Sequence, residues 1–219
     1  MPIATTLQNL LRHGVRRMGE LEFQSVASND SYQLCHWQDA EQAREPVYGG
    51  LERHEGPSAA RDLSLFSEDG RYRFSKGQRN LKRGWVMIFE DEEELRQALD
   101  QFYPAGLGVF LAYRDGTLET EDLRDKLERQ SGMYRMARSI SDAGAQRLVR
   151  DVCGPAHRCA KRILWQIDAH TPLEPSEASC FNGLPEGVAE AAAIPLLCRE
   201  ACNHFVVECR RVAKEESSL

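Results

Sequence analysis

The stretch WVMIFEDEEELRQALDQFY, residues 85–103, joins a strand pattern directly to a helix pattern. Its first five residues are continuously apolar, which is typical of a strand covered on both faces. The acidic residues Asp91–Glu94 complement the positive N-terminal end of a helix. One apolar stripe then follows at helical spacing, formed by Leu95, Leu99 and Phe102. We therefore predict a strand that runs into a helix, and we assign the acidic run to the helix dipole and solvent.

The sequence around this stretch predicts the other elements of an α+β domain. Apolar residues alternate or run together in segments that we expect to be strands: 21–23, 32–37, 71–74 and 108–113. Apolar residues at helical spacing predict helices over 5–18, 120–130 and 141–152. Glycine and proline between residues 41 and 57 indicate a connecting loop. The expected fold class is α+β, with a small, largely antiparallel sheet.

We expect two domains. The first is an α+β domain over residues 1–140, with a helix and a hairpin in 1–57 and a sheet with helices in 58–140. The second is a helical, cysteine-rich domain over residues 141–219. A chain of 219 residues is long enough to bury a hydrophobic core in each of them.

The composition excludes several classes of function. The formal net charge is −6 and no apolar run reaches the length of a membrane span, so we expect neither nucleic acid nor a membrane as a partner. The N-terminal sequence lacks the apolar core of a signal peptide, which predicts a cytoplasmic protein. The histidines have no visible acid or nucleophile partner, and there is no Walker loop or GxGxxG motif. No catalytic residue is therefore assigned.

Cysteine is concentrated in the C-terminal part of the chain. Six of the seven cysteines lie after residue 150: Cys153, Cys159, Cys180, Cys198, Cys202 and Cys209. Four of these form two close pairs with the spacings Cys-x5-Cys and Cys-x3-Cys. A reducing compartment keeps such thiols out of disulfides, so their clustering indicates a bound metal. Cys35 stands alone in an apparent strand and is interpreted as a small core residue.

Local sequence patterns give each thiol an expected position. One helix is expected to end at Cys153, and a second helix to carry Cys159. Cys180 falls in a stretch without periodicity and is expected in an irregular loop. Cys198 and Cys202 are four residues apart, so a helix that begins there would place both on one face, about one turn apart.

Four thiolates can hold either a tetrahedral zinc ion or an iron-sulfur cluster. Structural zinc sites usually use a Cys-x2-Cys pair, and the wider pairs of this chain favour the larger iron-sulfur cluster. A structural zinc site stays open as the alternative. A third interpretation is an enzyme in which the cluster acts as a Lewis acid at an iron that lacks one thiolate.

Three segments carry a resemblance to a known family: GMYRMA at residues 132–137, CAKRILW at 159–165 and CREACNHFV at 198–206. The chain resembles iron-sulfur proteins that are associated with, or fused to, CbiX-like sirohydrochlorin cobaltochelatases. The resemblance covers most of the chain and implies a stabilising α+β domain followed by a domain that binds a [4Fe-4S] cluster. Nothing in the chain resembles the chelatase half of that family.

The resemblance implies that Cys153, Cys159, Cys198 and Cys202 are the ligands of the cluster. Cys180 is the alternative ligand, because a loop could fold over the centre. Cys209 is interpreted as a packing or spare thiol. The two histidines beside the cysteine pairs could each replace a thiolate, although neither is required: His157 and His204.

The function expected from these observations is a redox or accessory role rather than that of a stand-alone enzyme. It would be electron transfer or redox sensing near tetrapyrrole metallation, with a chelatase or a redox protein as partner and a tetrapyrrole as a candidate ligand. The basic stretch Arg147–Arg162 is a candidate docking face for an acidic partner. The alternative is a zinc-binding interaction module without a redox role.

Overall fold

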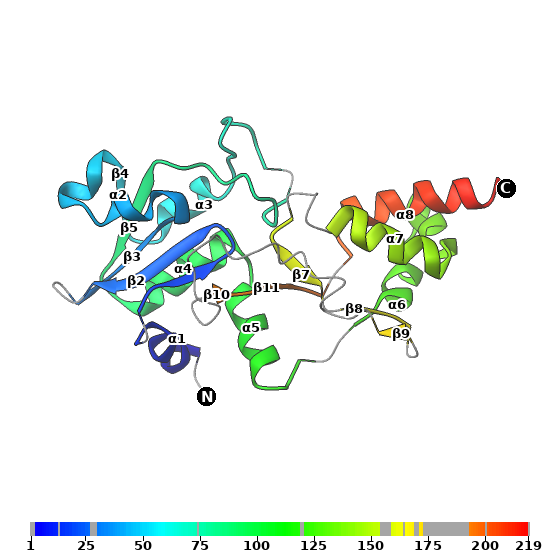
Figure 1. The fold of residues 1–219 in the computed structure, drawn as a ribbon, viewed down its shortest axis with the longest axis horizontal. Coiled ribbons are helices and arrows are strands. Elements are labelled where there is room, and N and C mark those ends of the chain that lie inside the picture. The colour runs from blue at the N-terminus through cyan, green and yellow to red at the C-terminus, as the bar shows by residue number, and fades with distance from the viewer. Residues whose placement is uncertain are drawn as a thin grey trace. The chain divides into compact units, whose positions relative to one another are not determined.

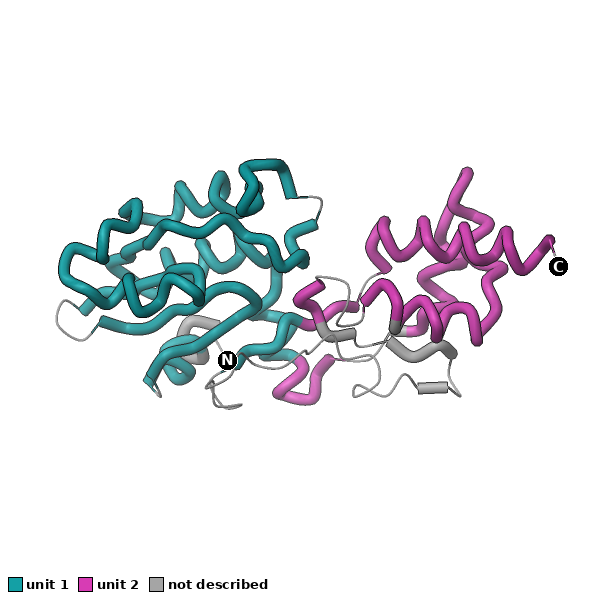
Figure 2. The backbone as a smooth tube through the Cα atoms, turned by 45° about the horizontal axis from the view of Figure 1, so that its top comes forward, with its two compact units in different colours: residues 1–112, 183–196 teal, residues 113–182, 197–219 magenta. Residues whose placement is uncertain are grey.

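The structure is a computed structural model. It describes residues 3–12, 14–26, 30–73, 75–118, 121–153, 159–163, 165–168, 171–172, 193–199 and 201–218. The chain divides into two compact units, which we call the first unit (residues 1–112 and 183–196) and the second unit (residues 113–182 and 197–219) (Figure 2). This division lies at residue 112, earlier than the boundary at 140 that the sequence predicted, and a later segment of the chain returns to the first unit.

The first unit is built on one mixed sheet. Its strands are, in spatial order, β10 (Ala193–Ile194), β1 (Arg16–Met18), β2 (Leu21–Val26), β3 (Ser31–His36), β5 (Trp85–Phe89) and β4 (Glu52–Glu55). The three central pairings are antiparallel and the two outer ones are parallel. The register sets Phe23 opposite Leu34, and Leu34 opposite Met87. All three side chains are buried, which places the core on this face of the sheet.

The helices of the first unit are α1 (Ile3–Leu11), α2 (Ala40–Ala43), α3 (Ser58–Leu63), α4 (Glu92–Phe102) and α5 (Gly106–Arg114), with 3₁₀ turns η1 (Trp37–Asp39) and η2 (Pro46–Gly50) (Figure 1). The strand and helix predicted from residues 85–103 are confirmed. Asp91 caps α4, because its carboxylate accepts a hydrogen bond from the backbone N–H of Glu94 at 2.9 Å. Trp85 of β5 stacks on Phe102 of α4 with ring centroids 5.1 Å apart.

Four predictions for the first unit are wrong in detail. Where a strand was predicted over 71–74, the described residues 71–73 form no strand, and Tyr72 makes an isolated bridge to Phe66. Residues 108–113 are part of helix α5 rather than a strand, because a short apolar run has no periodicity that could separate the two. The predicted helix over 5–18 ends at Leu11, and β1 follows it. The predicted loop over 41–57 contains η2 and strand β4, whose parallel pairing with β5 holds it in the sheet.

The second unit contains three helices and a 3₁₀ segment among the residues described: α6 (Leu123–Glu128), η3 (Gly132–Ser139), α7 (Asp142–Cys153) and α8 (Asn203–Glu216). Short strands accompany them: β6 (Glu121–Asp122), β7 (Lys161–Ile163), β8 (Trp165–Asp168), β9 (Thr171–Pro172) and β11 (Leu196–Cys198). Strand β11 pairs with β7, while β8 lies between β6 and β9. The domain is therefore mainly helical, as the sequence predicted, with small sheets that it did not predict.

One hydrophobic core joins the helices of the second unit. Its most deeply buried members come from different elements: Leu127, Ala137, Ala145, Phe205, Cys209 and Ala213. Arg124 of α6 donates to the backbone carbonyl of Ile140 at 2.7 Å and forms an ion pair with Asp142 at the start of α7. Among the described residues, none of the helices is both long and apolar enough to cross a membrane.

Candidate metal centre

Cys153 is the last residue of α7 and the most deeply buried of the four predicted ligands, with 8% of its surface exposed. Its helix carries Leu148, Val149 and Val152 into the core of the second unit, as their helical spacing predicted. The thiol thus reaches the core at the point where the helix ends, which is the position that the sequence predicted. The residues that follow it, 154–158, lie outside the described residues.

Cys159 does not lie in a helix. It precedes strand β7, and the helix predicted for this region is wrong for residues 159–163. Strand β7 pairs with β11, whose last residue is Cys198. The small sheet therefore connects the segments that carry one thiol of each cysteine pair.

Cys198 and Cys202 do not share a helix face. Cys198 ends strand β11, and Cys202 is the N-cap of α8, with extended backbone angles of φ −69° and ψ 158°. The spacing of four residues spans the junction between a strand and a helix, because β11 is held by its partner β7 and the helix starts only after Cys202. Cys202 is exposed, whereas Cys198 is only partly exposed and packs against the core.

The electrostatics of Cys153 show which thiols surround it. Burial raises the pKa of its thiol, and the negative charges that Cys159, Cys198, Cys202 and Cys209 would carry raise it further. Charge effects of this kind weaken with distance, so these thiols lie within electrostatic range of Cys153. Within the described part of the chain, no three His, Cys, Asp or Glu side chains are arranged so that they could hold a metal ion.

The chemistry of the donor set fits a soft metal centre. Thiolates are the ligands of iron-sulfur clusters and of structural zinc. Leu197 and Phe205, beside the second cysteine pair, are 6% and 0% exposed, so an apolar wall borders the thiols. Cys202 stands at the N-terminal end of α8, the end of the helix that carries its positive partial charge.

The remaining candidates differ in position. Cys209 lies in α8 with no exposed surface, and burial raises its pKa to about 12. The sequence offered one sign that Cys209 lies near the other thiols. Cys209 follows Cys202 by seven residues, a spacing that keeps two residues near the same face of a helix. Cys35 lies in the core of the first unit, as predicted. His204 is exposed on α8. Cys180 and His157 lie outside the described residues, so their roles stay predictions.

Comparisons with known proteins agree with this division of the chain. Residues 4–114 match the family described as the DR2241 stabilising domain, and residues 115–211 match the family described as a 4Fe-4S iron-sulfur cluster binding domain. The boundary between the two matches lies close to the boundary between the two compact units at residue 112. The comparison with curated proteins found no match.

A solved structure shares the fold. It is DR2241 from Deinococcus radiodurans, described as a multi-domain protein with structural similarity to chelatases and with two additional novel domains. The TM-score is 0.72 at 23% sequence identity, and the match covers 98% of this chain but 42% of that one. The chain thus spans less than half the length of this relative. With half of its residues in the first family match and most of the rest in the second, the chain belongs to the DR2241 stabilising-domain family and carries a 4Fe-4S cluster-binding domain.

Proposed function

We propose that Cys153, Cys159, Cys198 and Cys202 are the ligands of the [4Fe-4S] cluster, and that the protein uses it in electron transfer or redox sensing near tetrapyrrole metallation. The observation that carries the ligand assignment is the match of residues 115–211 to a 4Fe-4S cluster binding domain, which contains all four of these cysteines. It is supported by the charge effect of the other three thiols on Cys153, an effect that Cys209 shares. Cys180, which lies outside the described residues, is the alternative ligand.

The residues of this chain would do three things for the cluster. The thiolates bind it, the apolar side chains of Leu197 and Phe205 limit the access of water, and the first turn of α8 offers backbone N–H groups near Cys202. The bound cluster supplies the capacity to accept and release one electron. Because Cys202 is the exposed thiol of the set, we expect the solvent-facing side of the cluster to lie there.

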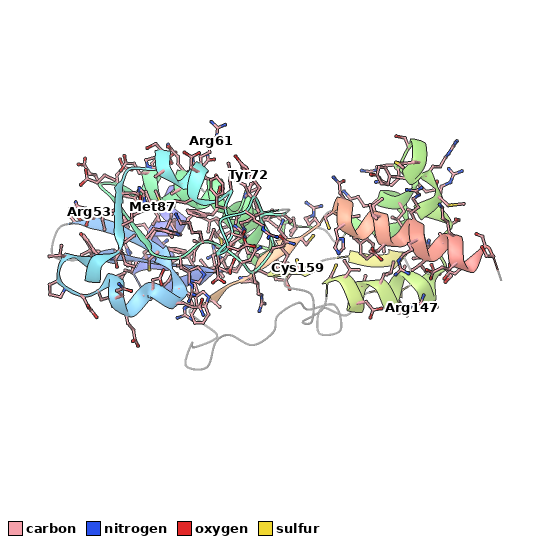
Figure 3. All side chains as sticks on the ribbon, turned by 90° about the horizontal axis from the view of Figure 1, so that it is seen from above. Arg53, Arg61, Tyr72, Met87, Arg147 and Cys159 are labelled. Atoms are coloured by element: carbon pink, nitrogen blue, oxygen red, sulfur yellow. The ribbon has the colours of Figure 1, made fainter. Side chains whose placement is uncertain are left out.

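The link to tetrapyrrole metallation has a different basis. It is supported by the solved relative, which is described as having structural similarity to chelatases. We propose a chelatase or a redox protein as the partner, in the cytoplasm, and neither nucleic acid nor a membrane. Arg147 is exposed on α7 and can take part in the proposed basic docking face (Figure 3), whereas Arg158 lies outside the described residues.

The test begins with the protein purified without oxygen. Iron, acid-labile sulfide and zinc are measured per chain, and visible and electron paramagnetic resonance spectra are recorded before and after dithionite. We expect iron and sulfide in near-equal amounts, and a visible absorption that weakens on reduction. Zinc alone in a colourless protein would contradict the redox function and favour a structural zinc module.

Single Cys→Ser variants test the ligand assignment. Replacement of Cys153, Cys159, Cys198 or Cys202 should each remove iron and sulfide, or change the resonance spectrum of the reduced cluster. Cys35→Ser and Cys209→Ser are the matched controls and should keep the iron content of the original protein. If Cys180→Ser loses iron while the variant of one of the four proposed ligands keeps its full iron content, Cys180 is a ligand in place of that cysteine.

A further inference from the structure

The first unit contains a strongly basic segment that the proposed cluster function does not use. Residues 71–84, RYRFSKGQRNLKRG, hold six lysines and arginines and no acidic residue, in a chain whose formal net charge is −6. Such a local excess of charge attracts anions even when the whole protein is acidic.

Two parts of this segment, around Tyr72 and around Leu81, pair with residues 66–67, and we call this arrangement the ribbon. Isolated antiparallel bridges join Phe66 to Tyr72 and Ser67 to Leu81. The second bridge places Lys82 opposite Phe66, and the backbone N–H of Lys82 donates to the carbonyl of Phe66 at 3.2 Å. Directly opposite residues project from the same face of a sheet, so Tyr72, Phe66 and Lys82 form one row across the ribbon.

The other face of the ribbon is fixed to the protein. Ser67 and Leu81 are 4% and 0% exposed, which identifies that face as the inner one. Arg73 also holds the ribbon from inside, because its buried guanidinium donates to Asn80 at 3.2 Å and pairs with Glu20 at 3.5 Å. The same Glu20 carboxylate accepts the backbone N–H of Leu81 at 3.1 Å. The row on the outer face is therefore held in place by hydrogen bonds and an ion pair on the inner face.

The outer face combines exposed aromatic surface with positive charge. Tyr72, labelled in Figure 3, is 75% exposed. Its ring lies against that of Phe66, with centroids 4.8 Å apart and the ring planes tilted by 36°. Lys82 is exposed and forms no ion pair with any residue in the described part of the chain. Arg71, beside Tyr72, is exposed and is paired only with the exposed Asp69, at 3.5 Å. Exposed pairs of this kind are weak, so Arg71 can exchange its partner for another anion.

We propose that this face, formed by Tyr72, Phe66 and Lys82 with Arg71 at its edge, binds a flat aromatic ring system that carries carboxylates at its rim. The ring stacks on Tyr72, and Lys82 in the same row takes one carboxylate. Arg71, which precedes Tyr72 in the chain and lies off that row, takes a second carboxylate from the edge of the ribbon. A carboxylate-bearing tetrapyrrole has this chemistry, and that identity rests on the proposed link to tetrapyrrole metallation.

The test uses the full cluster-loaded chain and uroporphyrin, a porphyrin with a carboxylate-rich rim, as the probe. Binding is followed by equilibrium dialysis without oxygen, at low and at high salt. We expect Tyr72→Ser and Lys82→Glu each to weaken binding by at least about fivefold, since one stacked ring or one charge contact is lost. Added salt should weaken binding to the original protein more than to Lys82→Glu.

Matched controls lie on the same unit, away from the ribbon. Val47→Ser removes another exposed apolar side chain, and Arg53→Glu reverses another exposed cation; both should bind as the original protein does. Absence of binding, equal binding by all variants, or tighter binding of an oligothymidylate than of the porphyrin would each overturn the proposal. Iron and sulfide contents are measured on the same samples, so failure of this site is distinguished from failure of the cluster assignment.

Discussion

Cys35 shows, at the scale of a single residue, how a thiol outside the metal centre is used. It lies in β3 opposite Glu22 and Val86, and 3% of its surface is exposed. Burial raises its pKa from 9.0 to about 12; Glu22 contributes to the rise and Arg44 opposes it. Such a thiol stays protonated at neutral pH and packs as a small apolar side chain, in contrast to a metal ligand.

This pKa predicts how stability changes in alkali. The unfolded thiol loses its proton near pH 9, whereas the folded thiol keeps it until about pH 12. Unfolding therefore releases a proton in this range, and the stabilisation present below pH 9 is lost as the pH rises towards 12, by up to about 1.4 kcal/mol per pH unit. Cys35→Val should show a smaller slope in urea unfolding between these pH values. If the free energy of unfolding falls with pH equally steeply in both proteins, Cys35 has the same pKa in the folded and the unfolded state.

At the scale of elements, the end of α8 fixes the beginning of α7. The Glu216 carboxylate accepts two hydrogen bonds from Ser141, one from the backbone N–H at 2.8 Å and one from the side-chain hydroxyl at 2.6 Å. The same hydroxyl accepts the N–H of Gly144 at 3.0 Å and so caps α7. These bonds lower the pKa of Glu216. One carboxylate thus joins the start of α7 to the end of α8. Cys153 and Cys202 lie at the other ends of these two helices.

We expect Glu216→Ala to destabilise the second unit by about 1 kcal/mol, which is typical for the loss of a helix cap. The effect should be present at neutral pH and should decline as the pH falls through the lowered pKa of Glu216, because the protonated acid accepts these bonds poorly. Thermal unfolding measures it. Glu215→Ala is the control: this exposed neighbour pairs only with Arg211 on the same helix, and its loss should change little.

The elements also show what a sequence can predict. Helix α4 was predictable because a cap, an acidic first turn and an apolar stripe all point to the same structure. Helix α5 was not, since its apolar run carries no period. The change from strand to helix between Cys198 and Cys202 depends on the pairing of β11 with β7, a contact between segments far apart in sequence. The proximity of Tyr72 to Lys82 likewise depends on a register that composition does not reveal.

On the scale of the whole molecule, the path of the chain separates the two cysteine pairs. In the first unit, β10 pairs with β1, and the chain belongs to the second unit again from Leu197, the residue before Cys198. The two pairs of proposed ligands are therefore separated in the sequence by a strand, β10, that belongs to the first unit. Holding such distant segments together costs loop entropy, which metal-thiolate bonds offset.

Removal of the cluster should accordingly loosen one unit and spare the other. The core of the first unit contains none of the proposed ligands, whereas Cys153 belongs to the core of the second. We expect oxidative loss of iron to raise hydrogen exchange in α7 and α8 by at least about tenfold, with exchange in β2, β3 and β5 unchanged. Cys153→Ala should reproduce this pattern without oxidation, and Cys209→Ala should not. Equal loosening of both units would contradict this prediction, because the cluster would then stabilise the whole chain.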